Sequence, residues 1–172
     1  LGREKSKRKL KLSGKVVLFV GRMIEKKGAG FLLKSANNFR DILFVFIGDG
    51  PMRQEIENKA KKLKNVIYAG KLMQNKPEEL DKLVDYYSAA DVFATIPTYD
   101  EGFGAVYLEA LGCGTPILCS DKGSLPTFLD DTVAKMIKPT QENVNSAIQE
   151  LLIKNSKTLE KMQNNCRKFA EE

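Results

Sequence analysis

Residues 15–51 read KVVLFVGRMIEKKGAGFLLKSANNFRDILFVFIGDGP. Two apolar runs of strand length, Lys15–Val20 and Ile42–Ile47, flank a segment of helical period, Gly28–Phe39. A short apolar run bounded by turn residues fits a strand that is buried in a parallel sheet. A strand, a helix and a second strand in this order are typical of a βαβ unit, which places both strands in one sheet.

The same alternation continues toward the C-terminus. Further strands are expected at Val66–Ala69, Asp91–Ile96, Thr115–Cys119 and Val133–Ile137. Helices are expected after Pro51, over Pro77–Ala90 (with Leu80, Leu83, Val84 and Tyr87 inward), Phe103–Leu111, Gln141–Lys154 and Lys157–Phe169, with a turn region near Gly123–Asp131. We therefore predict an α/β fold, a single Rossmann-like doubly wound parallel sheet of about six strands with helices on both faces. Its expected bounds are 14–153, between a basic linker at 1–13 and a C-terminal helix at 154–172.

Length and composition limit the class of protein. The 172 residues, 42% of them hydrophobic, suffice for one domain but not for two. No apolar run approaches the roughly 20 residues that span a bilayer, and no signal peptide is apparent, so we predict a cytoplasmic chain. Three cysteines without C-x-x-C spacing and the absence of histidine argue for reduced thiols and against a metal site.

The net charge of +6 is concentrated at the N-terminus. Residues 1–11 contain six of the 28 basic side chains and one of the 22 acidic ones, so the remaining 161 residues have a balance of only +1. A basic tail of this kind is read first as a solvated linker, with a peripheral contact to the inner, anionic face of the membrane as the second interpretation. A nucleic-acid arm is the third, and no aromatic residue interleaves the lysines as single-strand binding requires, so no nucleic-acid partner is predicted.

Candidate site residues lie in the loops that follow the strands. Ligands of such sheets bind outside the carboxyl ends of the strands, here near 21–28, 48–51, 70–76, 97–104 and 120–126. In the first loop, Arg22 can bind a phosphate through two parallel hydrogen bonds, and Lys27 can add a mobile positive charge. Both lie close to a helix that begins at Gly28. The second loop fails the G-x-G-x-x-G pattern because Arg53 stands at the third glycine position, which weakens a dehydrogenase interpretation.

The fourth loop carries the strongest signal. Gly102 and Gly104 let the backbone approach a ligand, and the following helix start offers free amides to a diphosphate. Those amides belong to Phe103, Gly104, Ala105 and Val106. Two carboxylates, Glu101 and Glu109, stand eight residues apart and suit the vicinal hydroxyls of a sugar or a ribose.

These stretches resemble the C-terminal, donor-binding domain of retaining glycosyltransferases of the two-domain GT-B type, group 1 or family 4, which includes mannosyl- and glucosyltransferases. The resemblance covers residues 14–153. It rests on G-R-x-x-x-x-K-G at 21–28, I-G-D-G-P at 47–51, A-D-V-F at 90–93, E-G-F-G-x-x-x-x-E-A at 101–110 and G-x-G-T-P-I at 112–117. The five motifs in this order are highly specific together.

The resemblance implies a role for each matching residue. Arg22 and Lys27, in the loop that starts at Gly21, neutralise the donor diphosphate and act with Glu101 as the catalytic set. Glu101 and the backbone of 102–104 meet the donor sugar, Glu109 meets the ribose, and the base lies near Lys71 and Leu72. The donor is a GDP- or UDP-linked hexose, with GDP-mannose preferred over UDP-glucose, and the acceptor is a glycan or a lipid-linked molecule.

The implied chemistry is transfer with retention, in which the leaving diphosphate is stabilised by positive charge. No cofactor and no metal are expected, because no D-x-D pair is present. Two features depart from the family pattern: Gly123-Ser124-Leu125-Pro126-Thr127 stands where G-G-x-x-E is common, and the acceptor-binding domain is not in the sequence. We therefore expect a chain that binds donor but transfers nothing alone. The alternatives are a stand-alone nucleotide-sugar-binding regulatory module and, more remotely, an oxidoreductase.

Overall fold

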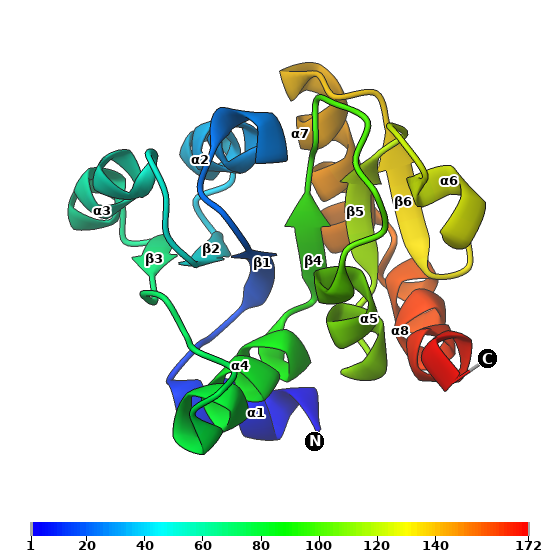
Figure 1. The fold of residues 1–172 in the computed structure, drawn as a ribbon, viewed down its shortest axis with the longest axis horizontal. Coiled ribbons are helices and arrows are strands. Elements are labelled where there is room, and N and C mark those ends of the chain that lie inside the picture. Colours follow the sequence, from blue (N-terminus) through cyan, green and yellow to red (C-terminus); the bar gives the residue numbers. More distant parts are fainter. Residues whose placement is uncertain (1, 172) are drawn as a thin grey trace.

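The computed structural model describes residues 2–171. Its centre is a six-stranded sheet in the order β3-β2-β1-β4-β5-β6, with every neighbouring pair parallel (Figure 1). The strands are β1 Lys15–Val20, β2 Ile42–Ile47, β3 Val66–Tyr68, β4 Val92–Thr95, β5 Ile117–Ser120 and β6 Ala134–Ile137. The order reverses between β1 and β4, so the predicted doubly wound parallel sheet is confirmed.

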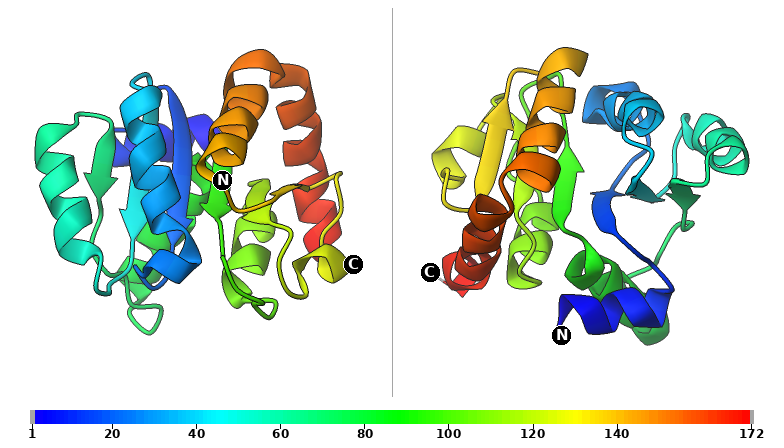
Figure 2. Two further views of the ribbon diagram at one scale, coloured as in Figure 1. Left: turned by 90° about the horizontal axis from the view of Figure 1, so that it is seen from above. Right: turned by 180° about the vertical axis from the view of Figure 1, so that it is seen from behind.

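Helices cover both faces of the sheet, as predicted. They are α1 Arg3–Leu10, α2 Ala29–Asn38, α3 Arg53–Lys62, α4 Pro77–Ala89, α5 Ala105–Gly112, α6 Leu125–Phe128, α7 Gln141–Gln149 and α8 Ser156–Glu171, with short helical turns η1 Glu25–Lys27 and η2 Glu150–Lys154. Helices α2, α3 and α7 lie over one face, and α1, α4 and α5 lie over the other (Figures 1 and 2). Within residues 2–171, no helix is both long and apolar enough to cross a membrane.

The strands are uninterrupted apolar runs because both faces of the sheet are buried. Along β1, Val17 and Phe19 belong to the core under α2 and α3, whereas Val16 and Leu18 belong to the core on the α4 and α5 side. All four are at most 1% exposed. Burying each such side chain stabilises the fold by about 1.5–3 kcal/mol, which explains why a run without polar alternation marks this strand.

Two local predictions are wrong. The turn region near Gly123–Asp131 contains the short helix α6, which opens with a proline in its first turn and buries Leu125 completely. Leu80, expected on the inner face of α4, is 40% exposed, whereas Leu83 and Tyr87 of the same helix are buried. Leu80 lies in the first turn of α4, where the helix extends beyond the edge of the core.

The basic N-terminal segment differs most from expectation. It was predicted as a solvated linker over 1–13, but Arg3–Leu10 is the helix α1, packed against α4 (Figure 1). The Lys7 ammonium lies 2.8 Å from Asp91 Oδ2 and donates to the Gly14 carbonyl at 2.7 Å, with the two side chains only 8% and 5% exposed. Arg3 donates to two backbone carbonyls, each at 2.9 Å. That the segment 1–13 links two domains stays a prediction.

A single reason explains this difference. Arg3, Ser6, Lys7 and Leu10 are spaced as one face of a helix, and that face meets the domain, while the exposed side chains of Lys5, Arg8 and Lys9 keep the charged face in water. The net charge of the whole segment does not distinguish the packed face of the helix from its exposed face. The C-terminal helix predicted over 154–172 is α8, and it buries Leu159, Met162 and Cys166 in the same cores as the sheet.

Candidate functional site

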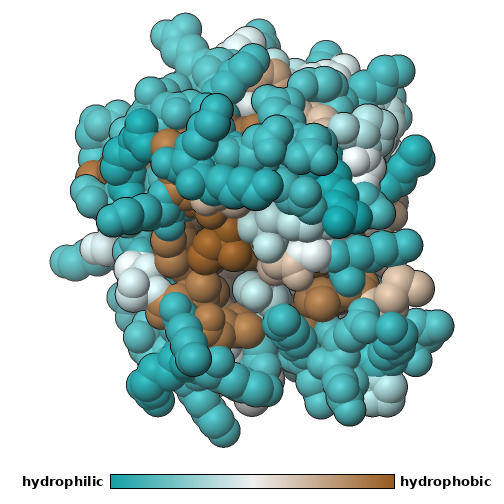
Figure 3. All heavy atoms as spheres, turned by 90° about the vertical axis from the view of Figure 1, so that its left-hand side faces the viewer, coloured by the Kyte–Doolittle hydropathy of each residue, from teal (hydrophilic) through white to brown (hydrophobic). Residues whose placement is uncertain are grey.

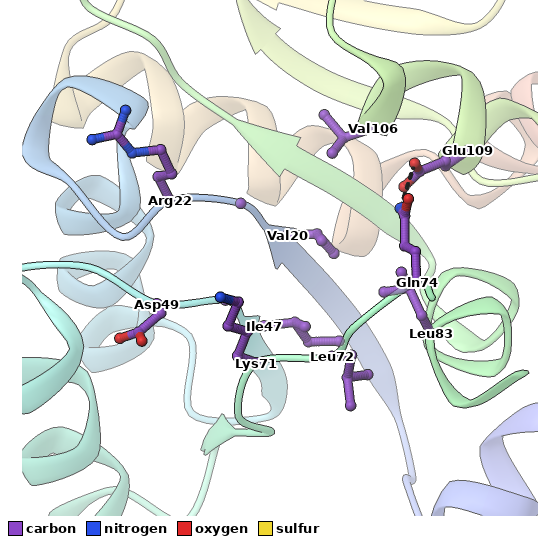
Figure 4. Close-up of a pocket in the computed structure, with 12 residues that line it drawn as sticks. Val20, Arg22, Ile47, Asp49, Lys71, Leu72, Gln74, Leu83, Val106 and Glu109 are labelled. Carbon is purple, nitrogen blue, oxygen red and sulfur yellow. Dashed lines mark hydrogen bonds between the residues drawn. The ribbon is translucent and has the colours of Figure 1, made fainter. Parts of the chain in front are cut away.

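A crevice opens at the carboxyl ends of β1 and β2. It has a volume of about 350 Å³ and lies between the loops after these strands, the loop after β3, and α5 (Figure 4). Its lining residues are Val20, Gly21, Arg22, Ile47, Gly48, Asp49, Lys71, Leu72, Gln74, Leu83, Val106 and Glu109. This is the place at which doubly wound sheets bind ligands.

The crevice has an apolar interior and a charged rim. Val20, Ile47, Leu72, Leu83 and Val106 supply its apolar lining. Seen from the side that carries α3, β3 and α4, the surface is hollowed, and apolar side chains gather in the hollow between hydrophilic rims (Figure 3). Such a mixture of apolar walls and a few polar groups is typical of small-molecule sites.

Two basic residues of the predicted site stand at the rim: Arg22, predicted for the diphosphate, and Lys71, predicted near the base. Arg22 follows β1 and Lys71 follows β3, and Figure 4 shows them reaching from separate loops. Within residues 2–171, neither side chain has a hydrogen-bond or ion-pair partner. The loop after β2 lies between the loops that carry them: a Cβ on Gly48 would lie 1.9 Å from the Gly21 carbonyl oxygen, and the Gly48 amide donates to the Gly70 carbonyl at 2.9 Å. The crevice therefore presents two cations to an anion, beside the carboxylates of Asp49 and Glu109.

Glu109 lines the crevice from α5. Its two carboxylate oxygens accept one hydrogen bond each, from Gln74 Nε2 and from the Tyr87 hydroxyl, both at 2.8 Å (Figure 4 draws the former). Burial, and then the neighbouring Glu109 carboxylate, raise the pKa of Tyr87 well above its usual range. The phenol therefore stays protonated and fixes the orientation of the carboxylate as a donor.

Lys27 and Glu101 do not line the crevice but meet beside it. The Lys27 ammonium forms an ion pair with Glu101 Oε1, and the Tyr99 hydroxyl donates to the same oxygen at 3.3 Å. The other oxygen, Oε2, is buried and has no hydrogen-bond partner among the described residues. The two side chains are 24% and 12% exposed, so the pair is largely shielded from water.

Backbone contacts bring these two loops together. The amides of Ile96 and Thr98 donate to the carbonyls of Lys27 and Lys26 at 3.1 and 2.9 Å. Gly28 sits at φ +83°, and a Cβ there would lie 2.4 Å from the Ile96 carbonyl oxygen. Only glycine permits this approach without displacing the strand end, so the G-R-x-x-x-x-K-G stretch has a structural reason for its last residue.

The loop after β5 holds Glu101 from the other side. The Ser124 amide donates to the Glu101 carbonyl at 3.1 Å, and its hydroxyl donates to the same oxygen at 3.3 Å. A Cβ on Gly123, at φ +65°, would lie 2.3 Å from that oxygen. The segment that departs from the family pattern therefore contacts Glu101 through its backbone and one hydroxyl.

The glycine-flanked loop contributes less directly than expected. Gly102, Gly104 and Ala105 are not among the crevice-lining residues, and Val106 is the one residue of the predicted amide set that is. The Phe103 ring packs against Tyr107 and Phe128, with ring centroids 5.6 and 5.0 Å apart. Helix α5 begins at Ala105, without a side-chain cap, so its first amides are available to a ligand.

The expectation that ligands bind at the carboxyl ends of the strands thus locates the crevice but not every residue that lines it. Six predicted residues line it: Gly21, Arg22, Lys71, Leu72, Val106 and Glu109. Asp49 and Gln74 were not singled out, although both lie in loops named for the site, and Tyr87 was recognised only as an inward residue of α4. No group of three or more metal-ligating side chains occurs within residues 2–171.

An α/β domain with charged residues of both signs around a crevice at its strand ends is typical of small-molecule-binding folds. Sequence similarity identifies the family to which this domain belongs. Residues 2–169 match the family model described as "Glycosyl transferases group 1". The chain belongs to this family. Its fold is therefore that of one domain of the GT-B glycosyltransferases, as predicted.

Curated relatives agree with this assignment. The chain is 30% identical over 150 residues to a D-inositol 3-phosphate glycosyltransferase of Mycobacteroides abscessus, covering 84% of this chain and 33% of the relative. It is 30% identical over 131 residues to the putative teichuronic acid biosynthesis glycosyltransferase TuaC of Bacillus subtilis, covering 76% of this chain and 31% of the relative. The chain thus spans about one third of the length of these relatives.

Solved structures share the fold. A sucrose-phosphate synthase from Thermosynechococcus elongatus superposes with a TM-score of 0.81 at 25% identity, over 98% of this chain and 44% of that one. Anabaena Alr3699/HepE in complex with UDP gives 0.80 at 19% identity, over 98% and 47%. The C-terminal domain of LpcC, a group 1 family glycosyl transferase from Francisella tularensis, gives 0.78 at 21% identity, over 99% and 91%.

Proposed function

We propose that this chain is the donor-binding domain of a retaining hexosyltransferase and that the crevice takes a nucleotide-diphosphate sugar. The observation that carries the proposal is the crevice of about 350 Å³, whose lining includes the oriented carboxylate of Glu109 and two cations, Arg22 and Lys71, that have no partner within residues 2–171. A nucleoside diphosphate presents the complementary groups: an anionic diphosphate and a ribose with two vicinal hydroxyls. Membership of the glycosyltransferase family supports the choice of a sugar-linked nucleotide.

Each group of the donor has a proposed partner. The base lies on the apolar wall near Leu72 and Leu83, which are both crevice residues. The ribose donates to Glu109, displacing Gln74 or sharing the carboxylate with it. The diphosphate meets Arg22 and Lys71 at the rim, together with Lys27 and the first amides of α5. A hydroxyl of the hexose donates to Glu101, whose Oε2 is buried without a partner within residues 2–171.

The proposed reaction requires positive charge from this chain rather than a catalytic base. As the bond to the anomeric carbon breaks, the diphosphate gains negative charge, and fixed cations beside it stabilise the transition state. A charge-assisted hydrogen bond of this kind contributes about 1.5–3 kcal/mol. We propose that the reaction proceeds with retention, without a metal ion or other cofactor.

Membership of the family guides the choice of donor, acceptor and location. UDP- and GDP-linked hexoses are both candidates, and the HepE structures in complex with UDP and with UDP-glucose support testing uridine donors first. Acceptor recognition, by a glycan or a lipid-linked molecule, is assigned to the part of the relatives' length that these residues do not match. We accordingly expect donor binding without transfer by this chain alone, at a cytoplasmic site peripheral to the membrane.

Titration calorimetry with UDP, GDP, UDP-glucose and GDP-mannose tests the proposal. The double variant Arg22→Ala, Lys27→Ala removes two phosphate contacts and is expected to weaken nucleotide binding at least tenfold, since each tenfold corresponds to ~1.4 kcal/mol. Lys26→Ala is the matched control, because it removes one exposed charge from the same turn. Unchanged affinity in the double variant would refute the phosphate assignment, and no binding of any nucleotide by the unaltered chain would refute the proposed function.

A further inference from the structure

Helix α1 contacts the helices that form one wall of the crevice. That wall consists of α4, which supplies Leu83, and of α5, which supplies Val106 and Glu109 (Figure 4). Helix α1 lies beside α4 and packs against it (Figures 1 and 2). The basic N-terminal segment is therefore connected to the crevice through α4, although none of its described residues lines the crevice.

One side chain of α1 joins the ends of both helices. The Arg3 guanidinium donates through Nε to the carbonyl of Ala90, which caps α4. It donates through Nη2 to the carbonyl of Gly114, just beyond the end of α5, and both distances are 2.9 Å. A guanidinium holds its donors in a rigid plane, so two hydrogen bonds from one group fix the spacing of the two carbonyls. Arg3 thus fixes the end of α4 relative to the end of α5.

The position of α4 relative to α5 decides whether Tyr87 reaches Glu109. Tyr87 lies in the last turn of α4, and its hydroxyl donates to Glu109 Oε2 at 2.8 Å. The Thr115 hydroxyl also connects the two segments, because it donates to the Tyr87 carbonyl at 2.6 Å. This second connection remains when Arg3 is replaced, so the helices stay together while the Tyr87–Glu109 contact loosens. A hydrogen bond weakens steeply as its angle departs from linear, so a small shift is sufficient.

Helix α1 is bonded to the α4 segment on both sides of Tyr87. Before it, Ser6 Oγ donates to Asp85 Oδ1 at 3.4 Å. After it, the Lys7 ammonium pairs with Asp91 Oδ2 at 2.8 Å. Release of α1 therefore removes the contacts that hold this end of α4, which couples the docked position of α1 to the orientation of the phenol.

Resting on the proposed function, we propose that α1 is a positioning element for the crevice and that Arg3 is the positioning residue through which it acts. With α1 docked, Tyr87 holds the Glu109 carboxylate toward the ribose hydroxyls of the nucleoside diphosphate. With α1 released, the carboxylate loses that orientation and the ribose binds less tightly. Thermodynamic linkage requires a reverse effect of the same size, so a ribose bound at Glu109 stabilises the docked position of α1.

Titration calorimetry on the whole chain with UDP and with 2′,3′-dideoxy-UDP, which lacks both ribose hydroxyls, tests this proposal. The guanosine pair is used instead if the unaltered chain prefers GDP. Arg3→Met removes both hydrogen bonds at nearly equal helix propensity and should weaken UDP binding about fivefold, equivalent to ~1 kcal/mol. The dideoxy analogue, which makes no use of Glu109, should bind within about twofold of its affinity for the unaltered chain. Arg3→Lys keeps the charge and one possible hydrogen bond, so its effect on UDP should be smaller.

Two controls separate positioning from stability. Lys5→Met changes an exposed residue of the same helix and should leave both affinities within about twofold. Ile148→Val removes a methyl group from the core on the opposite face of the sheet. It should lower Tm without changing the ratio of the two affinities, because α4 and α5 keep their contacts.

Hydrogen exchange of the α1 amides measures the reverse effect and needs no variant, so it decides the matter even if Arg3→Met does not fold. Saturating UDP should slow this exchange more than the saturating dideoxy analogue does, since only UDP binds through Glu109. Unchanged UDP affinity in Arg3→Met, equal weakening of both ligands, or equal slowing by both overturns this inference alone. Failure of the unaltered chain to bind any nucleotide overturns the proposed function as well.

Discussion

Replacing Lys7 by methionine should destabilise the domain strongly, although Lys7 lies far from the crevice. Its ammonium is 2.8 Å from Asp91 Oδ2, and the two side chains are 8% and 5% exposed. Methionine has nearly the same helix propensity as lysine and a similar length, so α1 itself is not penalised. What changes is that Asp91 loses its closest cation while remaining buried.

The structure sets the expected magnitude. Removing one partner of a buried ion pair costs about 3–5 kcal/mol, because the remaining charge is left uncompensated. Asp91 keeps the Val16 amide at 2.9 Å and a longer contact with Lys15 at 3.6 Å. These remaining partners place the expected loss at the lower end, about 3 kcal/mol. For a domain of this size, a loss of that magnitude lowers Tm by roughly 6–12 °C.

Urea denaturation followed by circular dichroism, together with differential scanning calorimetry, measures this loss. Lys5→Met is the matched control, because Lys5 is exposed on the same helix, and its effect should stay within about 0.5 kcal/mol. Combining Lys7→Met with Asp91→Asn should recover part of the stability, since no buried charge then lacks a partner. Equal unfolding free energies for Lys7→Met and Lys5→Met would refute the view that α1 is part of the folded domain.

Two other substitutions probe the site. Tyr87→Phe removes the hydrogen bond that orients Glu109, so calorimetry should show nucleotide affinity reduced about tenfold, and equal affinity would contradict the assigned role. Because a bond to a charged group contributes about 1.5–3 kcal/mol, the same change should also lower Tm by several degrees. Gly28→Ala places a Cβ 2.4 Å from the Ile96 carbonyl oxygen at a φ of +83°, so it should destabilise the domain by about 1–3 kcal/mol in urea denaturation. A denaturation midpoint matching that of the unaltered chain would show that the two loops tolerate separation.

The sheet was predictable because its signal is local. Lys15–Val20 and Ile42–Ile47 are strands with the predicted bounds, since a run buried on both faces leaves an uninterrupted apolar stretch in the sequence. The short helix α6 escaped prediction because four residues hold too little periodicity to be recognised. The packed helix α1 escaped for another reason: the partner of Lys7 is Asp91, 84 residues away.

The candidate site was predictable only in part. Arg22, Lys71 and Glu109 could be predicted because the order of strands and helices determines which loops lie at the carboxyl ends of the strands. That order does not determine how a side chain is oriented. Phe103 belongs to the expected cradle, but its ring packs against Phe128, and the hydrogen bond from Tyr87 to Glu109 joins two helices whose contact no sequence spacing reveals.

The central claim, that the crevice binds a nucleotide-diphosphate sugar, is tested most directly by two-dimensional amide NMR of the isotopically labelled chain during titration with UDP-glucose and with GDP-mannose. One of the two should shift a compact set of amides around the crevice, including those of Gly21, Gly48, Leu72 and Val106, in a saturable manner. The amides of α1 and α8 should stay in place. Saturating concentrations that leave the crevice amides unshifted, or that shift only residues outside it, would contradict the account.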